Sequence, residues 1–195
     1  MCWEVVLLQQ ISNIITTIRL ALALIFLYLF TQTELIFVAT IIFIIAAASD
    51  FLDGWIARKL KISSKFGEQF DPIADKVLTL SAFFAFAIEG IIPFWCVIII
   101  AVRDVANTLI RFLFLSQKNI PTSLFAKIKT VLQLIFISAI LLIKLFIISE
   151  IAPEYSGIIH SPIIFYSMIL ITIITIWTML EYIFKILITK NKGNV

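Results

Sequence analysis

The sequence predicts an all-α integral membrane protein, a bundle of six transmembrane helices. Of its 195 residues, 62% are apolar and 14% are charged, whereas charged residues make up roughly a quarter of an ordinary soluble domain. Apolar stretches of about 18 residues or more, enough to cross a hydrocarbon core of about 30 Å, recur along the whole length. Because they leave no room for a separate soluble domain, we expect residues 1–195 to form one membrane domain.

Polar and turn-forming sequence separates these apolar stretches. T-Q-T-E follows the first, residues 59–65 follow the second, and residues 89–93 form a turn before the fourth. A cap at residues 121–123 precedes the fifth, and a Ser-Pro pair at 161–162 opens the sixth. Residues 3–10 are apolar on one side and could form a short interfacial helix before the first span. The predicted spans are residues 11–30, 34–59, 66–89, 94–116, 124–148 and 162–189.

Lysines occur in alternate loops, which predicts how the bundle is oriented. The loops after the second, fourth and sixth spans, together with the adjoining ends of the spans, carry Lys59, Lys61, Lys65, Lys118, Lys127, Lys190 and Lys192. The opposite loops contain no lysine or arginine, so the positive-inside tendency places both termini in the cytoplasm. We expect a multi-pass protein of the bacterial cytoplasmic (inner) membrane, surrounded by lipid and without a nucleic acid partner. Lys144, toward the opposite side, has no evident partner in the sequence.

Four aspartates lie close together near the predicted cytoplasmic edge: Asp50, Asp53, Asp71 and Asp75. Carboxylates beside a hydrocarbon layer need compensation, most simply by divalent cations. On helices, Asp50 and Asp53 share one stripe, and Asp71 and Asp75 share another. Facing each other, the two stripes could hold one or two magnesium or manganese ions, which could clamp a diphosphate. The alternative is that these aspartates cap helices or pair with lysines.

The pattern D-x2-D-G-x2-A-R-x8-G-x3-D-x3-D, from Asp50 to Asp75, resembles the signature of the CDP-alcohol phosphatidyltransferases without departure. The resemblance implies a six-helix membrane enzyme that uses Mg²⁺ or Mn²⁺, as a pair of ions. The enzyme would transfer a phosphatidyl or similar group from a CDP-activated donor to an acceptor hydroxyl, releasing CMP. It also implies that Asp50, Asp53, Asp71 and Asp75 bind metal and that Asp75 takes the proton of the hydroxyl. The positions implied to bind CDP are Asp50, Gly54, Ala57, Arg58, Gly67 and Asp71.

Cationic residues outside the signature suggest an acceptor that carries its own phosphate. Arg103 and Arg111 lie eight residues apart in the fourth span, and Lys127 and Lys129 lie at the start of the fifth. We predict that these four side chains bind the acceptor phosphate. The alternative is that the arginines pair with Asp104 or a helix end and that the lysines are ordinary cytoplasmic charges.

Three segments narrow the resemblance to the glycerol-phosphate phosphatidyltransferases within this family. They are I-S-N-I-I-T-T-I-R at residues 11–19, V-R-D-V at 102–105 and A-K-I-K-T at 126–130, with departures at Ser12, Asp104 and Ala126. The resemblance implies CDP-diacylglycerol and sn-glycerol 3-phosphate as substrates, and it suggests a homodimer. Cardiolipin synthase or another enzyme of the family with a different acceptor is the nearest alternative. A metal-binding membrane transporter is the alternative from another class.

Overall fold

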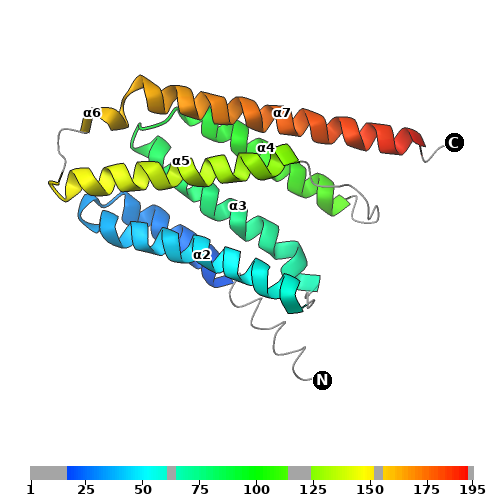
Figure 1. Ribbon diagram of the computed structural model, residues 1–195, viewed down its shortest axis with the longest axis horizontal. Coiled ribbons are helices and arrows are strands. Elements are labelled where there is room, and N and C mark those ends of the chain that lie inside the picture. Colours follow the sequence, from blue (N-terminus) through cyan, green and yellow to red (C-terminus); the bar gives the residue numbers. More distant parts are fainter. Residues whose placement is uncertain (1–16, 61–64, 114–123, 152–155, 193–195) are drawn as a thin grey trace.

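The computed structural model describes residues 17–60, 65–113, 124–151 and 156–192, and every element in these ranges is helical (Figure 1). Side chains are described within residues 17–49, 76–110, 128–151 and 157–184, Thr33 excepted. A helix at Thr17–Phe30, which carries no label in Figure 1, is the first element. The labelled elements are η1 (Thr33–Leu35), α2 (Ile36–Leu60), α3 (Lys65–Ile88), α4 (Phe94–Leu113), α5 (Leu124–Ile148), α6 (Ser156–Ile159) and α7 (Pro162–Lys192).

The six long helices agree with the six predicted spans, and two predicted boundaries have a clear physical cause. Gly90 has a φ of 72°, a conformation that glycine adopts without a steric penalty. Its N–H donates to Ala87 O at 3.1 Å, and Ile91 N donates to Phe86 O at 2.9 Å, so α3 ends in a Schellman motif. Pro162 begins α7, where its missing N–H removes no helical hydrogen bond. The predicted interfacial helix at residues 3–10 and the cap at 121–123 lie outside the described residues.

The long helices form an antiparallel bundle (Figure 1). Helix α3 packs against α2, α4 and α5, while α7 packs against α4 and α5. The end of α2, the start of α3, the end of α4 and the start of α5 lie toward one end of the bundle, to which the last turns of α7 also extend (Figure 1). The turn between α3 and α4, together with α6, lies toward the other end. This alternation brings together the chain segments that the sequence predicts to be cytoplasmic.

Phenylalanines hold the first helix against its neighbours in the core. Phe26 and Phe43 of α2 have ring centroids 5.3 Å apart, and Phe30 and Phe86 of α3 have centroids 5.2 Å apart. All four rings are buried. Tilted ring pairs of this kind stabilise a core beyond the area that they bury, so the helix Thr17–Phe30 is an integral part of the bundle.

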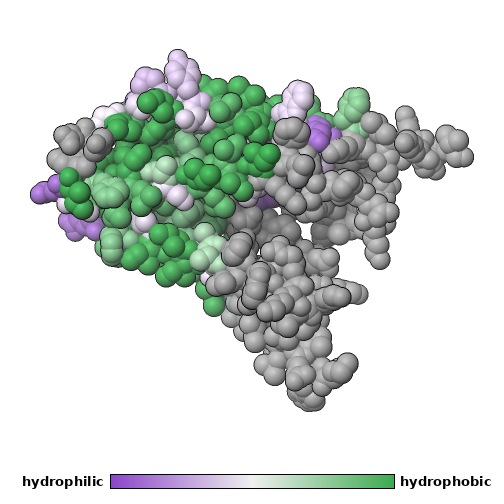
Figure 2. Space-filling model, viewed as in Figure 1, coloured by the Kyte–Doolittle hydropathy of each residue, from purple (hydrophilic) through white to green (hydrophobic). Residues whose placement is uncertain are grey.

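The outside of the bundle is also apolar, and Figure 2 shows hydrophobic residues over most of the described surface. Exposed apolar side chains occur on every long helix, and α3 contributes one at its end. Examples are Leu24, Ile44, Ile88, Val102, Ile135, Ile163 and Trp177. Two stretches, Ile128–Ile148 and Gly157–Phe184, are long and apolar enough to cross a membrane, and Thr17–Phe30, Ile36–Ser49 and Lys76–Ile88 are shorter apolar helices. An apolar exterior of this extent is typical of a surface that faces lipid. The number of crossings and their orientation stay predictions.

Lys144 does have a partner, contrary to the impression that the sequence gives. Its Nζ lies against both carboxylate oxygens of Glu89, directly after the last turn of α3, and 3.9 Å from the centre of the Phe30 ring. The two charged residues are 55 positions apart in the chain, so only the packing of α5 against α3 brings them together. This contact joins three helices at the end of the bundle opposite the aspartates.

Candidate functional site

The four signature aspartates occupy adjoining ends of two packed helices. Asp50 and Asp53 lie in the second half of α2, and Asp71 and Asp75 lie in the first half of α3. These two helices pack against each other, and only residues 61–64 separate them in the chain. The prediction that both pairs lie on helices, each pair with the spacing of one helical stripe, is therefore confirmed. Their side chains lie outside the described part of the structure.

The donor chemistry of this segment suits a hard cation. Its candidate ligands are all carboxylates, and oxygen ligands are those that magnesium and manganese prefer. Among the side chains that the structure describes, no three histidine, cysteine, aspartate or glutamate residues gather into another metal site. The carboxylates that α2 and α3 carry in this segment are therefore candidate ligands for a divalent cation.

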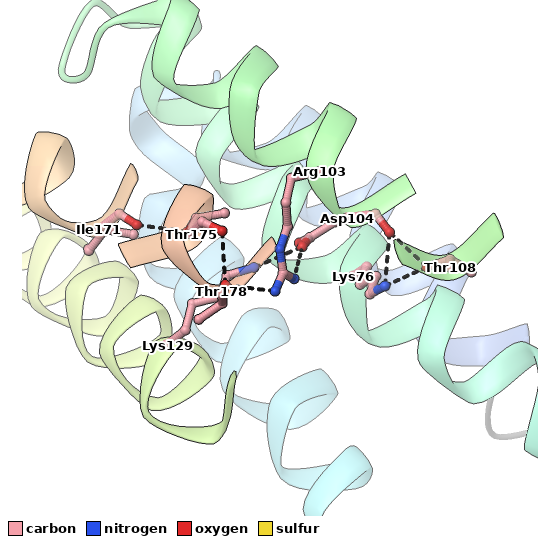
Figure 3. Close-up of polar contacts among 8 residues, drawn as sticks. All are labelled: Lys76, Arg103, Asp104, Thr108, Lys129, Ile171, Thr175 and Thr178. Carbon is pink, nitrogen blue, oxygen red and sulfur yellow. Dashed lines mark hydrogen bonds and ion pairs between the residues drawn. The ribbon is translucent and has the colours of Figure 1, made fainter. Parts of the chain in front are cut away.

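A buried charge cluster on α4 and α5 contains two of the residues predicted to bind the acceptor phosphate. Arg103, Asp104 and Lys129 are 8%, 4% and 4% exposed. Arg103 Nη1 lies 2.7 Å from Asp104 Oδ1, and Lys129 Nζ lies 2.8 Å from the same oxygen (Figure 3). One carboxylate oxygen of Asp104 thus joins a cation of its own helix to a cation of the next long helix.

Helix α7 holds the other side of the Arg103 guanidinium. Arg103 Nη2 donates to Thr178 Oγ1 at 2.8 Å, and Thr178 Oγ1 donates in turn to Thr175 O at 2.8 Å (Figure 3). The Asn107 side chain lies against the same guanidinium. When the oxygen and nitrogen of its amide are assigned from the hydrogen-bond geometry, the amide oxygen accepts from Arg103 Nε at 3.1 Å. A planar fork with several donors can serve these groups simultaneously, which an ammonium group cannot do with the same geometry.

Helix α3 contacts the cluster through Lys76, which directly follows Asp75. Lys76 Nζ donates to the backbone oxygen of Asp104 at 2.9 Å and to Thr108 Oγ1 (Figure 3). The Thr108 hydroxyl also donates to Asp104 O, at 2.8 Å. Asp104 is therefore held from α3 through its backbone and from α5 through its side chain.

The described side chains of the buried cluster include two cations, Arg103 and Lys129, that share one carboxylate. Among the described side chains, Asp104 is the one carboxylate that contacts Arg103 and Lys129, and buried cations need compensating partners. Gln133 follows Lys129 by four positions on the same stripe of α5 and is also buried. Its Nε2 has no hydrogen-bond partner within the part of the chain that the structure describes. Gln133 therefore offers a hydrogen-bond donor one helical turn from Lys129.

The structure brings together Arg103 and Lys129, as predicted, but through a carboxylate that the sequence offered only as an alternative partner of the arginine. Arg111 lies on α4 and Lys127 on α5, and their side chains are outside the described residues. The contributions of Thr178 and Lys76 were not predicted. One sequence signal could have pointed to α7, because Thr172, Thr175 and Thr178 place hydroxyls at intervals of three within an apolar helix, where they share one face.

The fold and site together define a helical membrane protein whose interior holds charged groups near one end of the bundle. A family model described as CDP-alcohol phosphatidyltransferase matches residues 9–188. The chain belongs to the CDP-alcohol phosphatidyltransferase family, which confirms the resemblance of its aspartate signature.

Individual relatives carry more specific names. A CDP-diacylglycerol–glycerol-3-phosphate 3-phosphatidyltransferase of Bacillus subtilis is 39% identical over 103 residues, which cover 52% of this chain and 53% of the relative. One of the same name from Rickettsia typhi is 34% identical over 125 residues, covering 64% and 65%. A probable phosphatidylglycerophosphate synthase of Mycobacterium tuberculosis is 31% identical over 175 residues, covering 86% and 78%. The chain thus spans about half of the first relative's length and just under two thirds of the second's.

The Asp104→Asn variant should be markedly less stable than the unmodified protein. The change leaves Arg103 and Lys129 buried without their shared carboxylate, and breaking a buried ion pair from one side typically costs about 3–5 kcal/mol. Thermal unfolding of the detergent-solubilised protein measures the effect. Glu150→Gln, in an exposed turn, is the matched control. Equal unfolding temperatures for the two variants would contradict the assigned role of Asp104.

Proposed function

We propose that this protein transfers the phosphatidyl group of CDP-diacylglycerol to sn-glycerol 3-phosphate, forming phosphatidylglycerophosphate and CMP in bacterial phospholipid synthesis. The observation that carries the proposal is the buried cluster of Arg103, Asp104 and Lys129, in which two cations share one carboxylate. Because α3 carries Asp75 and contacts this cluster through the next residue, a phosphate-bearing acceptor bound there would lie beside the acidic signature. The names of the relatives support the same acceptor.

In this proposal the phosphate of the acceptor binds between α4 and α5. Arg103 and Lys129 would contact it from inside the bundle, and Arg111 and Lys127 would contact it from nearer the ends of their helices. Phosphate oxygens accept several charge-assisted hydrogen bonds, and the arginine fork fits them in a bidentate manner. Glycerol 3-phosphate would thereby be oriented with a free hydroxyl toward α3.

The donor would occupy the segment shared by α2 and α3. Metal ions held by Asp50, Asp53, Asp71 and Asp75, Mg²⁺ or Mn²⁺ and two in number, would neutralise charge on the diphosphate when bound. The cytidine and its phosphates would be bound by Asp50, Gly54, Ala57, Arg58, Gly67 and Asp71. Asp75 would take the proton of the acceptor hydroxyl. The hydroxyl oxygen would attack the phosphatidyl phosphorus as the bond from that phosphorus to CMP breaks.

We further propose that residues 1–195 form one domain that crosses the bacterial cytoplasmic membrane six times. Both termini and the aspartate segment would face the cytoplasm, where glycerol 3-phosphate is dissolved. The diacylglycerol chains would stay among the membrane lipids beside the apolar surface of Figure 2. A homodimer is proposed from the family resemblance.

An acceptor panel tests this function. Purified protein in lipid–detergent micelles receives CDP-diacylglycerol and magnesium, with glycerol 3-phosphate, phosphatidylglycerol, serine, inositol or inositol phosphate supplied singly. We expect CMP release with glycerol 3-phosphate, and we expect its loss on chelation of the metal and its recovery on addition of magnesium or manganese. CMP release with phosphatidylglycerol and with none of the other acceptors would replace the proposed function by cardiolipin synthesis. If none of the supplied acceptors supports CMP release, the enzyme assignment is contradicted.

The Asp75→Asn variant should lose transfer while it retains most of its affinity for CDP-diacylglycerol. Removing a general base typically slows a reaction by roughly 10²- to 10⁴-fold, while the other three aspartates remain to support donor binding. Single-turnover CMP release and a donor-binding titration separate the two properties. Glu34→Gln, which alters an exposed carboxylate directly before the start of α2, should behave like the unmodified protein. Normal turnover by Asp75→Asn would remove Asp75 from the mechanism.

A further inference from the structure

The contacts of Lys76 link the two halves of the proposed active site. Lys76 is the residue directly after Asp75, and its Nζ donates to two acceptors on α4, Asp104 O at 2.9 Å and Thr108 Oγ1 (Figure 3). The residue that it contacts through the backbone is the one whose carboxylate joins Arg103 to Lys129. A single side chain therefore connects the end of the acidic signature to the centre of the buried cation cluster.

This contact constrains both the spacing and the rotation of α3. Successive residues on an α-helix point about 100° apart, so anchoring Lys76 on α4 fixes the direction in which position 75 projects. Hydrogen bonds from an ammonium group are roughly twice as strong as those between neutral groups. The Thr108 hydroxyl completes a closed triangle because it also donates to Asp104 O, at 2.8 Å.

The proposed reaction depends on this spacing. Asp75 must come within hydrogen-bond reach of the acceptor hydroxyl while the acceptor phosphate is held by Arg103 and Lys129. Both requirements act on one small molecule, so the distance between α3 and α4 must match its length. A misplacement of about 1 Å in such an arrangement can reduce a rate by roughly 10²-fold.

We propose that Lys76 is a positioning residue that sets the separation of Asp75 from the Arg103–Lys129 pair by anchoring α3 to α4 through Asp104 O and Thr108 Oγ1. The inference rests on the proposed function for the identity of the acceptor. It does not make Lys76 a ligand of either substrate. Lys76 acts on the reaction through the helix that carries Asp75.

Four variants of the full chain test the role of Lys76: Lys76→Met, Lys76→Arg, Thr108→Val and the double variant Lys76→Met/Thr108→Val. We expect Lys76→Met to lower kcat by roughly 10²-fold with much smaller changes in KM for either substrate. Thr108→Val, which removes one acceptor of the tether, should lower kcat less. Lys76→Arg, which keeps the charge and the donors, should recover part of the activity. The double variant should be no slower than Lys76→Met, because both changes break the same contact.

Thr40→Val is the matched control, because Thr40 makes the same kind of hydroxyl bond to the carbonyl four residues earlier, 2.8 Å to Ile36 O, away from the cluster. The unfolding temperature of each variant is measured alongside kcat. Unchanged kcat in Thr108→Val, or multiplicative losses in the double variant, would overturn the tether even if Lys76→Met were slow. A loss of kcat that merely follows loss of stability would overturn it too.

The unmodified protein in the same assay separates this inference from the proposed function. If it releases CMP with glycerol 3-phosphate, the variants test the tether directly. If it uses a different acceptor, the proposed function fails and the same four variants test the tether with that acceptor. If no acceptor supports CMP release, both the proposed function and the positioning role of Lys76 are contradicted.

Discussion

The ion pair that Asp104 makes with both Arg103 and Lys129 is the interaction on which the rest of the site depends. Two cations that are almost fully buried would be unstable in this bundle without a carboxylate between them. Through these partners Asp104 joins α4 to α5, and Arg103 extends the connection to Thr178 of α7. Lys76 adds α3 through the backbone of the same residue. Four long helices therefore meet around one aspartate.

The apolar exterior explains why such a cluster lies inside. A helix surrounded by lipid gains little from burying apolar side chains against another helix, so polar contacts and close packing fix its neighbours. Among the described side chains, the Asp104 cluster and the Lys144–Glu89 pair near the opposite end are polar contacts of this kind. The second pair is complete with one charge of each sign. The first has two cations for one described carboxylate, which is why a phosphate-bearing acceptor is proposed there and not at Lys144.

Local sequence was sufficient to predict the helices and several of their ends. Hydropathy indicates where the long helices occur. Gly90 and Pro162 end and begin helices through their own backbone conformations, so these helix boundaries depend on residues that are close together in the sequence. The aspartate spacing likewise predicted a segment on α2 and α3 and the family. Contacts between distant helices were not predictable in this way. Lys76 and Thr108 are 32 positions apart, and Arg103 and Thr178 are 75 apart, and six apolar helices can be packed in many orders that sequence periodicity does not distinguish.

The central claim is that the acceptor phosphate binds the Arg103–Lys129 pair while the acidic signature holds metal and donor. An experimental structure of the protein with manganese, CDP-diacylglycerol and glycerol 3-phosphate measures this most directly, because the anomalous signal of manganese locates the metal independently of the substrates. We expect manganese among Asp50, Asp53, Asp71 and Asp75, and the acceptor phosphate in hydrogen-bond contact with both Arg103 and Lys129. A phosphate bound elsewhere, with the Asp104 cluster unchanged and closed, would contradict it.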